Sequence, residues 1–173
     1  MFFYGSNSKF PGNIEVKKLT DQDSDLITQA AIWFKEKWGW AADFPSLEKR
    51  KEMLKSHVNP PNALYMLMYA GLPVGMFILD KWTNVKSHEK LHLDNALELD
   101  SVYVEQSFRG LGLGGFIVRS AKEIAKSDGA DLIILDTLTP ALNHFYERHG
   151  AKVVCEGRYF QAATDILQIN LRP

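Results

Sequence analysis

A cluster of glycines lies in the middle of the chain, where Gly110, Gly112, Gly114 and Gly115 follow Arg109. Glycine lets the backbone adopt unusual conformations and lets a ligand approach the main chain closely. If a strand ends before these glycines and a helix begins after them, the N–H groups of the first helical turn and the helix dipole attract an anion. The Arg109 guanidinium adds positive charge and a planar set of donors. The pattern therefore predicts a turn that binds a phosphate-bearing ligand.

Glycines at this spacing occur in more than one kind of phosphate-binding turn. Gly110, Gly112 and Gly115 spell G-x-G-x-x-G, and Asp136 follows about 20 residues later, where a nicotinamide-binding fold places an acid on the ribose. The rest of the chain is too short for the further parallel βα units of that fold. A P-loop would need Gly-Lys-Ser/Thr after the glycines, and the sequence has none. A nicotinamide-binding enzyme stays open as an alternative, in which Asp136→Asn would weaken cofactor binding.

The elements around the glycines alternate in a definite order. The predicted strands cover residues 14–19, 63–70, 74–79, 97–104, 131–136, 152–157 and 164–171, and the predicted helices cover 23–38, 46–58, the segment from the glycines to about 127, and 139–150. The strand–helix–strand crossover over 97–136 should place two strands parallel, whereas hairpins make the rest antiparallel. The fold class is therefore α+β, a mixed sheet with helices on its faces.

Composition limits the classes of protein to which the chain can belong. With 173 residues, 46% hydrophobic and 24% charged, it has the size of one globular domain, with residues 1–13 as an N-terminal extension. A formal net charge of -1 lacks the basic excess of nucleic-acid-binding proteins. The cationic residues Lys49, Arg50, Lys51 and Lys55 look like a solvated helix face and not like a nucleic-acid patch. The single Cys155 excludes an intrachain disulfide. No segment reads as a signal peptide or membrane span, so we expect a cytoplasmic protein without nucleic-acid or membrane partners.

The glycine segment resembles a known motif. Residues 104–114, VEQSFRGLGLG, resemble the acetyl-coenzyme A motif of the GNAT superfamily of N-acetyltransferases. Arg109, Gly112 and Gly114 match its pattern of Gln or Arg, two residues, Gly, one residue, and Gly or Ala. Gln106 stands where the family often has proline, which is a mild departure.

A second segment resembles the same family. Residues 139–151, TPALNHFYERHGA, are similar to the family's Asn-Pro-Ala-x-x-x-Phe-Tyr-x-x-x-Gly-Phe segment. Thr139 stands where an asparagine is common, and Ala151 stands where an aromatic residue is common. The hairpin turn at residues 71–75 also looks like the family's turn between its second and third strands. The resemblance covers about residues 14–171 and implies a mostly antiparallel sheet of about seven strands, with one parallel crossover and about four flanking helices.

The resemblance implies that the chain binds acetyl-CoA. The strand end at residues 102–104 would lend backbone groups to the pantetheine arm, and an N–H there would polarise the thioester carbonyl. The residues that the resemblance assigns to the cofactor are Val102, Tyr103, Val104, Arg109, Gly110, Leu111, Gly112, Leu113, Gly114, Gly115, Thr139 and Tyr146.

The resemblance also implies an acid and a base. Tyr146 matches the family's general acid, although proton transfer from a tyrosine to a thiolate is uphill by about 2 kcal/mol, so a hydrogen bond to the sulfur is the second interpretation. Glu98 lies where some branches have a catalytic glutamate, with Asp100 as the backup base and His92 as a further alternative. Strand alternation would place Glu98 and Asp100 on one face with Val102 and Val104. Cys155 lies outside both motifs, so we expect direct transfer in a ternary complex.

The acceptor is expected to be a primary amine of a small molecule. Aromatic residues and one carboxylate near the predicted cleft would suit a cationic amine; they are Trp38, Trp40, Phe44, Tyr159 and Asp100. A protein lysine or N-terminal amine is the runner-up, and a non-catalytic acyl-CoA-binding module is a further alternative. His88 and His92 lack companion ligands, so no metal site is expected. The resemblance leaves a homodimer open.

Overall fold

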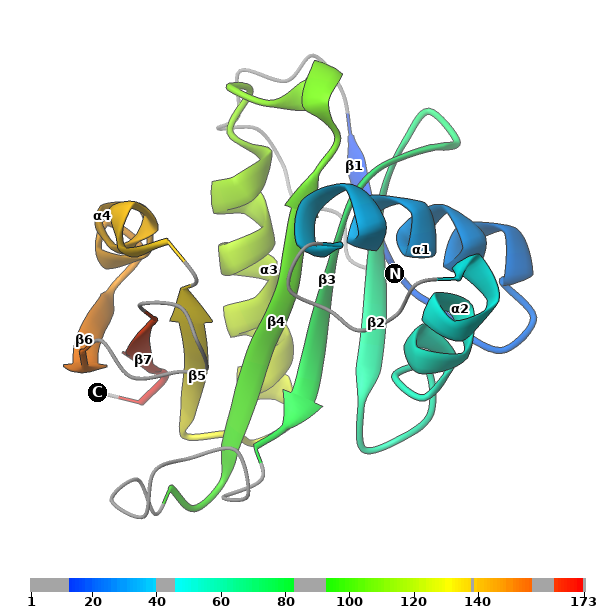
Figure 1. Ribbon diagram of the computed structural model, residues 1–173. Helices are drawn as coiled ribbons and strands as arrows, with labels where there is room; N and C mark the ends of the chain where they lie inside the picture. Colours follow the sequence, from blue (N-terminus) through cyan, green and yellow to red (C-terminus); the bar gives the residue numbers. More distant parts are fainter. Residues whose placement is uncertain (1–12, 40–45, 83–92, 138, 157–163, 173) are drawn as a thin grey trace. The chain divides into compact units, whose positions relative to one another are not determined.

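The computed structural model describes residues 13–39, 46–82, 93–137, 139–156 and 164–172 (Figure 1). Within these residues the chain forms seven strands and four α-helices. The strands are β1 (Ile14–Lys18), β2 (Ala63–Tyr69), β3 (Leu72–Lys81), β4 (Ala96–Val104), β5 (Leu132–Thr137), β6 (Ala151–Cys155) and β7 (Asp165–Asn170). The helices are α1 (Ser24–Trp38), α2 (Leu47–Lys55), α3 (Leu113–Ser127) and α4 (Asn143–Glu147).

The seven strands lie in one sheet in the order β1-β2-β3-β4-β5-β7-β6. β4 and β5 pair in parallel, with Glu98 opposite Ile134. The pairs β1–β2, β2–β3, β5–β7 and β6–β7 are antiparallel. The mixed sheet with one parallel crossover, predicted from the order of the elements, is confirmed.

The helix expected over residues 139–150 is shorter than predicted. Pro140–Leu142 form a 3-10 turn, in which the N–H of Leu142 donates to the carbonyl of Thr139 at 2.9 Å, and only Asn143–Glu147 are α-helical. Gly150 stops the segment with a left-handed φ of +90°. The motif residue Tyr146 therefore lies on a helix of little more than one turn.

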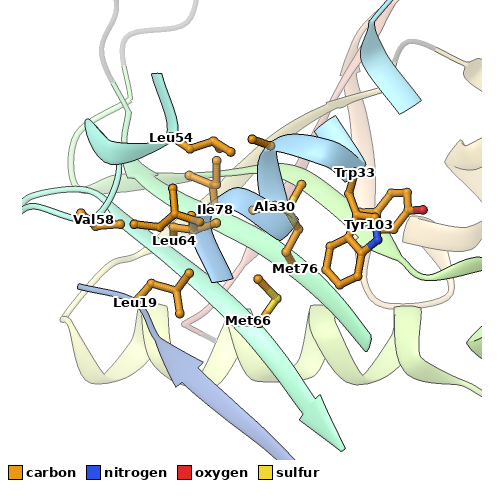
Figure 2. Close-up of a cluster of buried hydrophobic side chains, with 12 residues drawn as sticks. Leu19, Ala30, Trp33, Leu54, Val58, Leu64, Met66, Met76, Ile78 and Tyr103 are labelled. Carbon is orange, nitrogen blue, oxygen red and sulfur yellow. The ribbon is translucent and has the colours of Figure 1, made fainter. Parts of the chain in front are cut away.

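Contacts group the chain into two compact units, each of which is described by itself. Residues 1–79 and 101–117 belong to the first unit, and residues 80–100 and 118–173 belong to the second. The core of the first unit is shown in Figure 2, where side chains of α1, α2, β2 and β3 pack with Tyr103. Alternate residues of β2 (Leu64, Met66) and of β3 (Met76, Ile78) enter this core, as period-two spacing predicts.

Helix α2 joins this core in a way that the sequence did not indicate. Ser46 caps the helix, because its hydroxyl accepts a hydrogen bond from the N–H of Lys49 at 3.2 Å. Arg50 is only 6% exposed, and its Nε donates to the carbonyl of Ala31 in α1 at 3.2 Å. The prediction of a solvated cationic face was thus wrong at Arg50, which fastens α2 to α1.

The second unit has its own apolar cluster. Trp82, Ala96, Ile134 and Ile166 form its buried members, and Cys155 packs against them. In β5, Ile133, Ile134 and Leu135 are at most 1% exposed. This confirms that the continuous apolar run of β5 is covered on both faces.

Candidate functional site

Gly110 and Gly112 lie in the turn between β4 and α3, and Gly114 and Gly115 lie in the first turn of α3 (Figure 1). A short 3-10 turn at Gln106–Phe108 follows β4, and α3 begins with a hydrogen bond from the N–H of Phe116 to the carbonyl of Gly112 at 3.0 Å. Gly110 and Gly112 have left-handed φ angles of +77° and +88°, which only glycine adopts without strain. A Cβ built at either position meets no atom within 4 Å, so the backbone there is open to approach. The predicted strand–turn–helix arrangement is confirmed.

The first turn of α3 supplies the donors that an anion needs. The N–H groups of Leu113, Gly114 and Gly115 have no carbonyl acceptor four residues earlier within the helix. The helix dipole adds roughly half a positive charge at this end. An anion at the open side of the turn would therefore face the first-turn N–H groups and a favourable potential together.

Arg109 lies at the entrance of this turn and is fastened to the end of β4. Its Nε donates to the carbonyl of Val104 at 2.9 Å, and its guanidinium carbon lies 5.5 Å from the centroid of the Tyr103 ring. Arginine carries five N–H donors, so this contact leaves the terminal nitrogens for other acceptors. Its predicted contact with a cofactor stays a prediction, whereas its place beside the turn is observed.

The end of β4 is also held by α1, which the sequence analysis missed. Lys37 Nζ donates to the carbonyl of Val102 at 2.6 Å, and the hydroxyl of Tyr103 donates to Glu36 Oε2 at 2.9 Å. Trp33 Nε1 donates to Glu105 Oε2 at 2.8 Å. The Trp33 and Tyr103 rings stack with centroids 5.1 Å apart (Figure 2). No spacing pattern could show these contacts, because they join residues far apart in the sequence.

The side chain of Tyr103 has a structural role, and only the main-chain atoms of this residue are available to a ligand. Its side chain is 3% exposed and lies in the core of the first unit. Burial above all, then the hydrogen bond to Glu36 and the negative charge of Glu105, raises the pKa of Tyr103 to about 12. The phenol thus stays protonated and bonded to Glu36, so a ligand would meet only main-chain atoms of this residue.

Gly75 lets β3 approach the end of β4. A Cβ at Gly75 would lie 2.8 Å from the carbonyl oxygen of Tyr103, closer than real Cβ atoms come. Next to it, the N–H of Glu105 donates to the carbonyl of Val74 at 3.0 Å. The hairpin segment at residues 71–75 therefore helps to fix the strand end from which the glycine turn departs.

The alternation of β4 is interrupted at Ser101, whose φ is +50°. Glu98 is buried at 8% exposure, whereas Asp100, Val102 and Val104 are half-buried. That these four residues share one face stays a prediction, because a left-handed residue inside a strand interrupts the period-two alternation on which it rested. Glu98 nevertheless stays a candidate base, with Asp100 in the more accessible position.

Tyr146 lies on α4 in the second unit and is 8% exposed. Its ring meets the Phe145 ring edge-on at 4.9 Å between centroids. Burial above all, and then the negative charges of Asp136 and Asp100, raises the pKa of Tyr146 to about 12. The phenol therefore keeps its proton well above neutral pH and can act only as a neutral hydrogen-bonding group or proton donor there.

Of the remaining predicted residues, some lie outside the described residues and the others differ in burial. Trp40, Phe44, His92 and Tyr159 lie outside the described residues. Trp38 is half-buried beside Phe34, and Thr139 is exposed. Leu111 in the turn is half-buried, and Leu113 at the start of α3 is buried. Among the residues with described positions, no group of three potential ligands could hold a metal ion, and no helix is long and apolar enough to cross a membrane.

A mixed sheet with a parallel β4–α3–β5 crossover and an open glycine turn is the arrangement of the acyl-CoA N-acyltransferase fold that the sequence resemblance implies. The model of the acetyltransferase (GNAT) family matches residues 27–151. The chain belongs to the acetyltransferase (GNAT) family, and its fold and relatives support an acetyltransferase enzyme.

One curated relative is the uncharacterized N-acetyltransferase YjcF of Bacillus subtilis (strain 168). It is 33% identical over 72 residues, which are 42% of this chain and 51% of the relative, so the match spans about half the length of that protein.

Solved structures share the fold. An aminoglycoside 6'-N-acetyltransferase complexed with coenzyme A is 17% identical, with a TM-score of 0.70 over 92% of this chain and 98% of the other. The PaiA N-acetyltransferase of Thermoplasma acidophilum, also in complex with coenzyme A, is 19% identical, with a TM-score of 0.66 over 91% of this chain and 98% of the other.

Proposed function

We propose that the protein transfers an acetyl group from acetyl-CoA to a primary amine of a small molecule, directly and in a ternary complex. The observation that carries this proposal is the open glycine turn, where Gly110 and Gly112 are left-handed and leave space beside the backbone at the head of α3. A pyrophosphate suits such a turn, because it can accept from several N–H groups at once. Coenzyme A is bound by two proteins of the same fold.

The residues of the turn would hold the donor, which supplies a thioester with an electrophilic acyl carbon and a thiolate leaving group. The first-turn N–H groups of α3 would bind the pyrophosphate, and the Arg109 guanidinium would add charge beside it. Backbone groups at the end of β4 would bind the pantetheine arm. A main-chain N–H in this strand would stabilise the negative charge that develops on the carbonyl oxygen.

Tyr146 would donate a hydrogen bond to the departing sulfur. A pKa of about 12 for this phenol lies well above the pKa of about 8.5 of a free thiol. Complete transfer of the proton would be uphill by roughly 5 kcal/mol, so Tyr146 would stabilise the thiolate while keeping its own proton. Of the two roles considered for this residue, the raised pKa favours the hydrogen bond.

The acceptor must lose one proton before or while its nitrogen attacks. Glu98 would take this proton, directly or through a water molecule, and Asp100 is the alternative. As the new C–N bond forms and the C–S bond breaks, the nitrogen loses its second proton to solvent, and the released thiolate takes a proton from solvent. The negative charges of Asp100 and Asp136 act on the Tyr146 phenol, and the same charges favour an acceptor that arrives as an ammonium ion.

Two measurements test the proposal. Calorimetric titration of the purified protein with acetyl-CoA and, separately, with NADH identifies the ligand of the turn; we expect micromolar binding of acetyl-CoA and none of NADH. Thiol release is then followed with spermidine, kanamycin and a lysine-containing peptide as acceptors, and we expect turnover with a small amine. Binding of NADH alone would overturn the proposal. Binding of acetyl-CoA without turnover in any assay, by wild type or by Tyr146→Phe, would favour a non-catalytic binding module.

A further inference from the structure

Asn143 is the first residue of α4, and its side-chain amide bonds to the last paired residues of the β5–β7 ladder. Thr137 and Asp165 are opposite each other at the end of that antiparallel ladder. The hydroxyl of Thr137 donates to Asn143 Oδ1 at 2.8 Å, and Asn143 Nδ2 donates to Asp165 Oδ2 at 2.6 Å. One side chain thus bonds two strands and a helix together.

The orientation of this amide is fixed by its partners. A carboxylate accepts hydrogen bonds but does not donate them, so the NH₂ group of Asn143 must face Asp165. The oxygen then faces Thr137, whose hydroxyl can donate. Thr137 is 2% exposed and Asp165 is 9% exposed, so solvent competes little for these bonds. A flipped amide would place oxygen against oxygen at 2.6 Å, and the arrangement therefore has one stable form.

Helix α4 depends on such external bonds. It has only five residues, and no side chain caps its N-terminus. A helix of this length is far below the roughly 12 residues at which isolated helices begin to form. Beyond its C-terminal end, Lys122 Nζ donates to the carbonyl of His149 at 3.1 Å. Asn143 provides the corresponding attachment at the beginning.

Tyr146 is three residues after Asn143, so the two side chains lie on the same side of α4, one turn apart. Both are turned away from solvent: Tyr146 is buried and Asn143 is half-buried, whereas their neighbours His144 and Glu147 are exposed. A rotation or shift of the beginning of α4 would therefore be passed directly to the phenol. A displacement of about 1 Å at a reacting group is enough to lower a rate by about a hundredfold.

We propose that Asn143, through its bonds to Thr137 and Asp165, is a positioning residue that holds Tyr146 in its productive place. This inference rests on the proposed function of Tyr146 in acetyl transfer, and it concerns a residue that neither sequence motif fixes. Asn143 itself does not touch the reacting atoms in this proposal. Its effect on turnover is exerted only through Tyr146.

The test is a double-mutant cycle with the best acceptor among spermidine, kanamycin and the lysine peptide. Asn143→Ala should lower kcat about tenfold and leave KM for acetyl-CoA within about twofold. In the Tyr146→Phe background, the same substitution should lower kcat by less than about twofold, because the group that it positions is already gone. His144→Ala is the matched control on the same helix. It removes an exposed contact of 2.9 Å between His144 Nδ1 and Glu147 Oε2, and it should leave kcat unchanged.

Amide hydrogen exchange provides a readout that does not need turnover. Asn143→Ala should raise exchange at residues 143–149 at least tenfold, whereas His144→Ala should not. Equal losses of kcat in both Tyr146 backgrounds would overturn the inference, and so would unchanged exchange in this segment. If wild type transfers no acetyl group to any acceptor, the proposed function fails, and the exchange result still decides whether Asn143 holds α4.

Discussion

Lys37 on α1 donates a 2.6 Å hydrogen bond to the carbonyl of Val102 in β4. A peptide unit is planar, so fixing this carbonyl also fixes the N–H of Tyr103, which belongs to the same unit and points the opposite way. The contact therefore orients a main-chain donor at the strand end that leads into the glycine turn. It gives α1 a part in presenting the backbone of β4, beyond its contribution to the core.

Replacing Lys37 with methionine should weaken acetyl-CoA binding. Methionine keeps most of the aliphatic stem but removes the ammonium group, so the peptide between Val102 and Tyr103 loses its restraint. A loss of about 1 kcal/mol corresponds to a dissociation constant about fivefold higher. Lys35→Met is the matched control on the exposed side of the same helix and should leave the constant unchanged. Calorimetry distinguishes the two, and equal affinity in both variants would refute a role for Lys37.

Gly112→Ala and Gly129→Ala should have similar effects on stability and different effects on binding. Both glycines have left-handed φ angles, +88° and +79°, and neither Cβ would meet an atom within 4 Å. Each alanine should therefore destabilise the fold by about 1–2 kcal/mol through backbone strain alone. Only the alanine at 112 should raise the dissociation constant for acetyl-CoA, by at least tenfold, because it redirects the donors of the turn. Thermal unfolding and calorimetry together measure this, and equal binding by the two variants would contradict it.

The strand–turn–helix around Arg109 could be predicted from the sequence because its signals are local. The glycines and the apolar face of α3 are recognised from neighbouring residues in the sequence alone. The burial of Arg50 could not be predicted, because its partner is the carbonyl of Ala31 in another helix. The left-handed conformation of Ser101 could not be predicted either, since serine has no local preference for that conformation. These misses share one cause: tertiary contacts decide them.

In the candidate site too, residues in local motifs could be predicted, whereas contacts between distant residues could not. Tyr146 was singled out by its motif, and its burial and raised pKa suit a phenol that donates a hydrogen bond and keeps its own proton. The bonds of Asn143 and Lys37 follow from contacts across the fold, which residue spacing does not report. Trp40, Phe44 and Tyr159, proposed for the acceptor, lie outside the described residues and stay predictions.

Stability should fall steeply in alkali because two tyrosines have pKa values raised to about 12, mainly by burial. Between about pH 10 and pH 12 the unfolded chain loses these protons while the folded chain keeps them, so rising pH favours unfolding. Each of Tyr103 and Tyr146 should account for up to roughly 3 kcal/mol of this loss. Urea unfolding at about pH 9 and about pH 11.5 should show a smaller loss for Tyr146→Phe than for wild type. Parallel losses would show that the Tyr146 pKa is not raised.

Glu98→Gln and Asp100→Asn should separate the two candidate bases. Each substitution keeps the size of the side chain and removes its ability to take a proton at neutral pH. If Glu98 is the base, Glu98→Gln should lower kcat by about a hundredfold or more and remove the rise of kcat/KM with pH that reports ionisation of the base. Asp100→Asn should lower kcat less than about tenfold and keep that rise.

The half-buried position of Asp100 makes the opposite result informative. Loss of the pH-dependent rise in Asp100→Asn, with its retention in Glu98→Gln, would assign the proton to the more accessible carboxylate. Because Glu98 is only 8% exposed and its backbone pairs with β5, its substitution could also disturb the sheet. Thermal unfolding of both variants controls for this: a variant that unfolds like wild type and has lost the rise in its pH profile has lost the base itself.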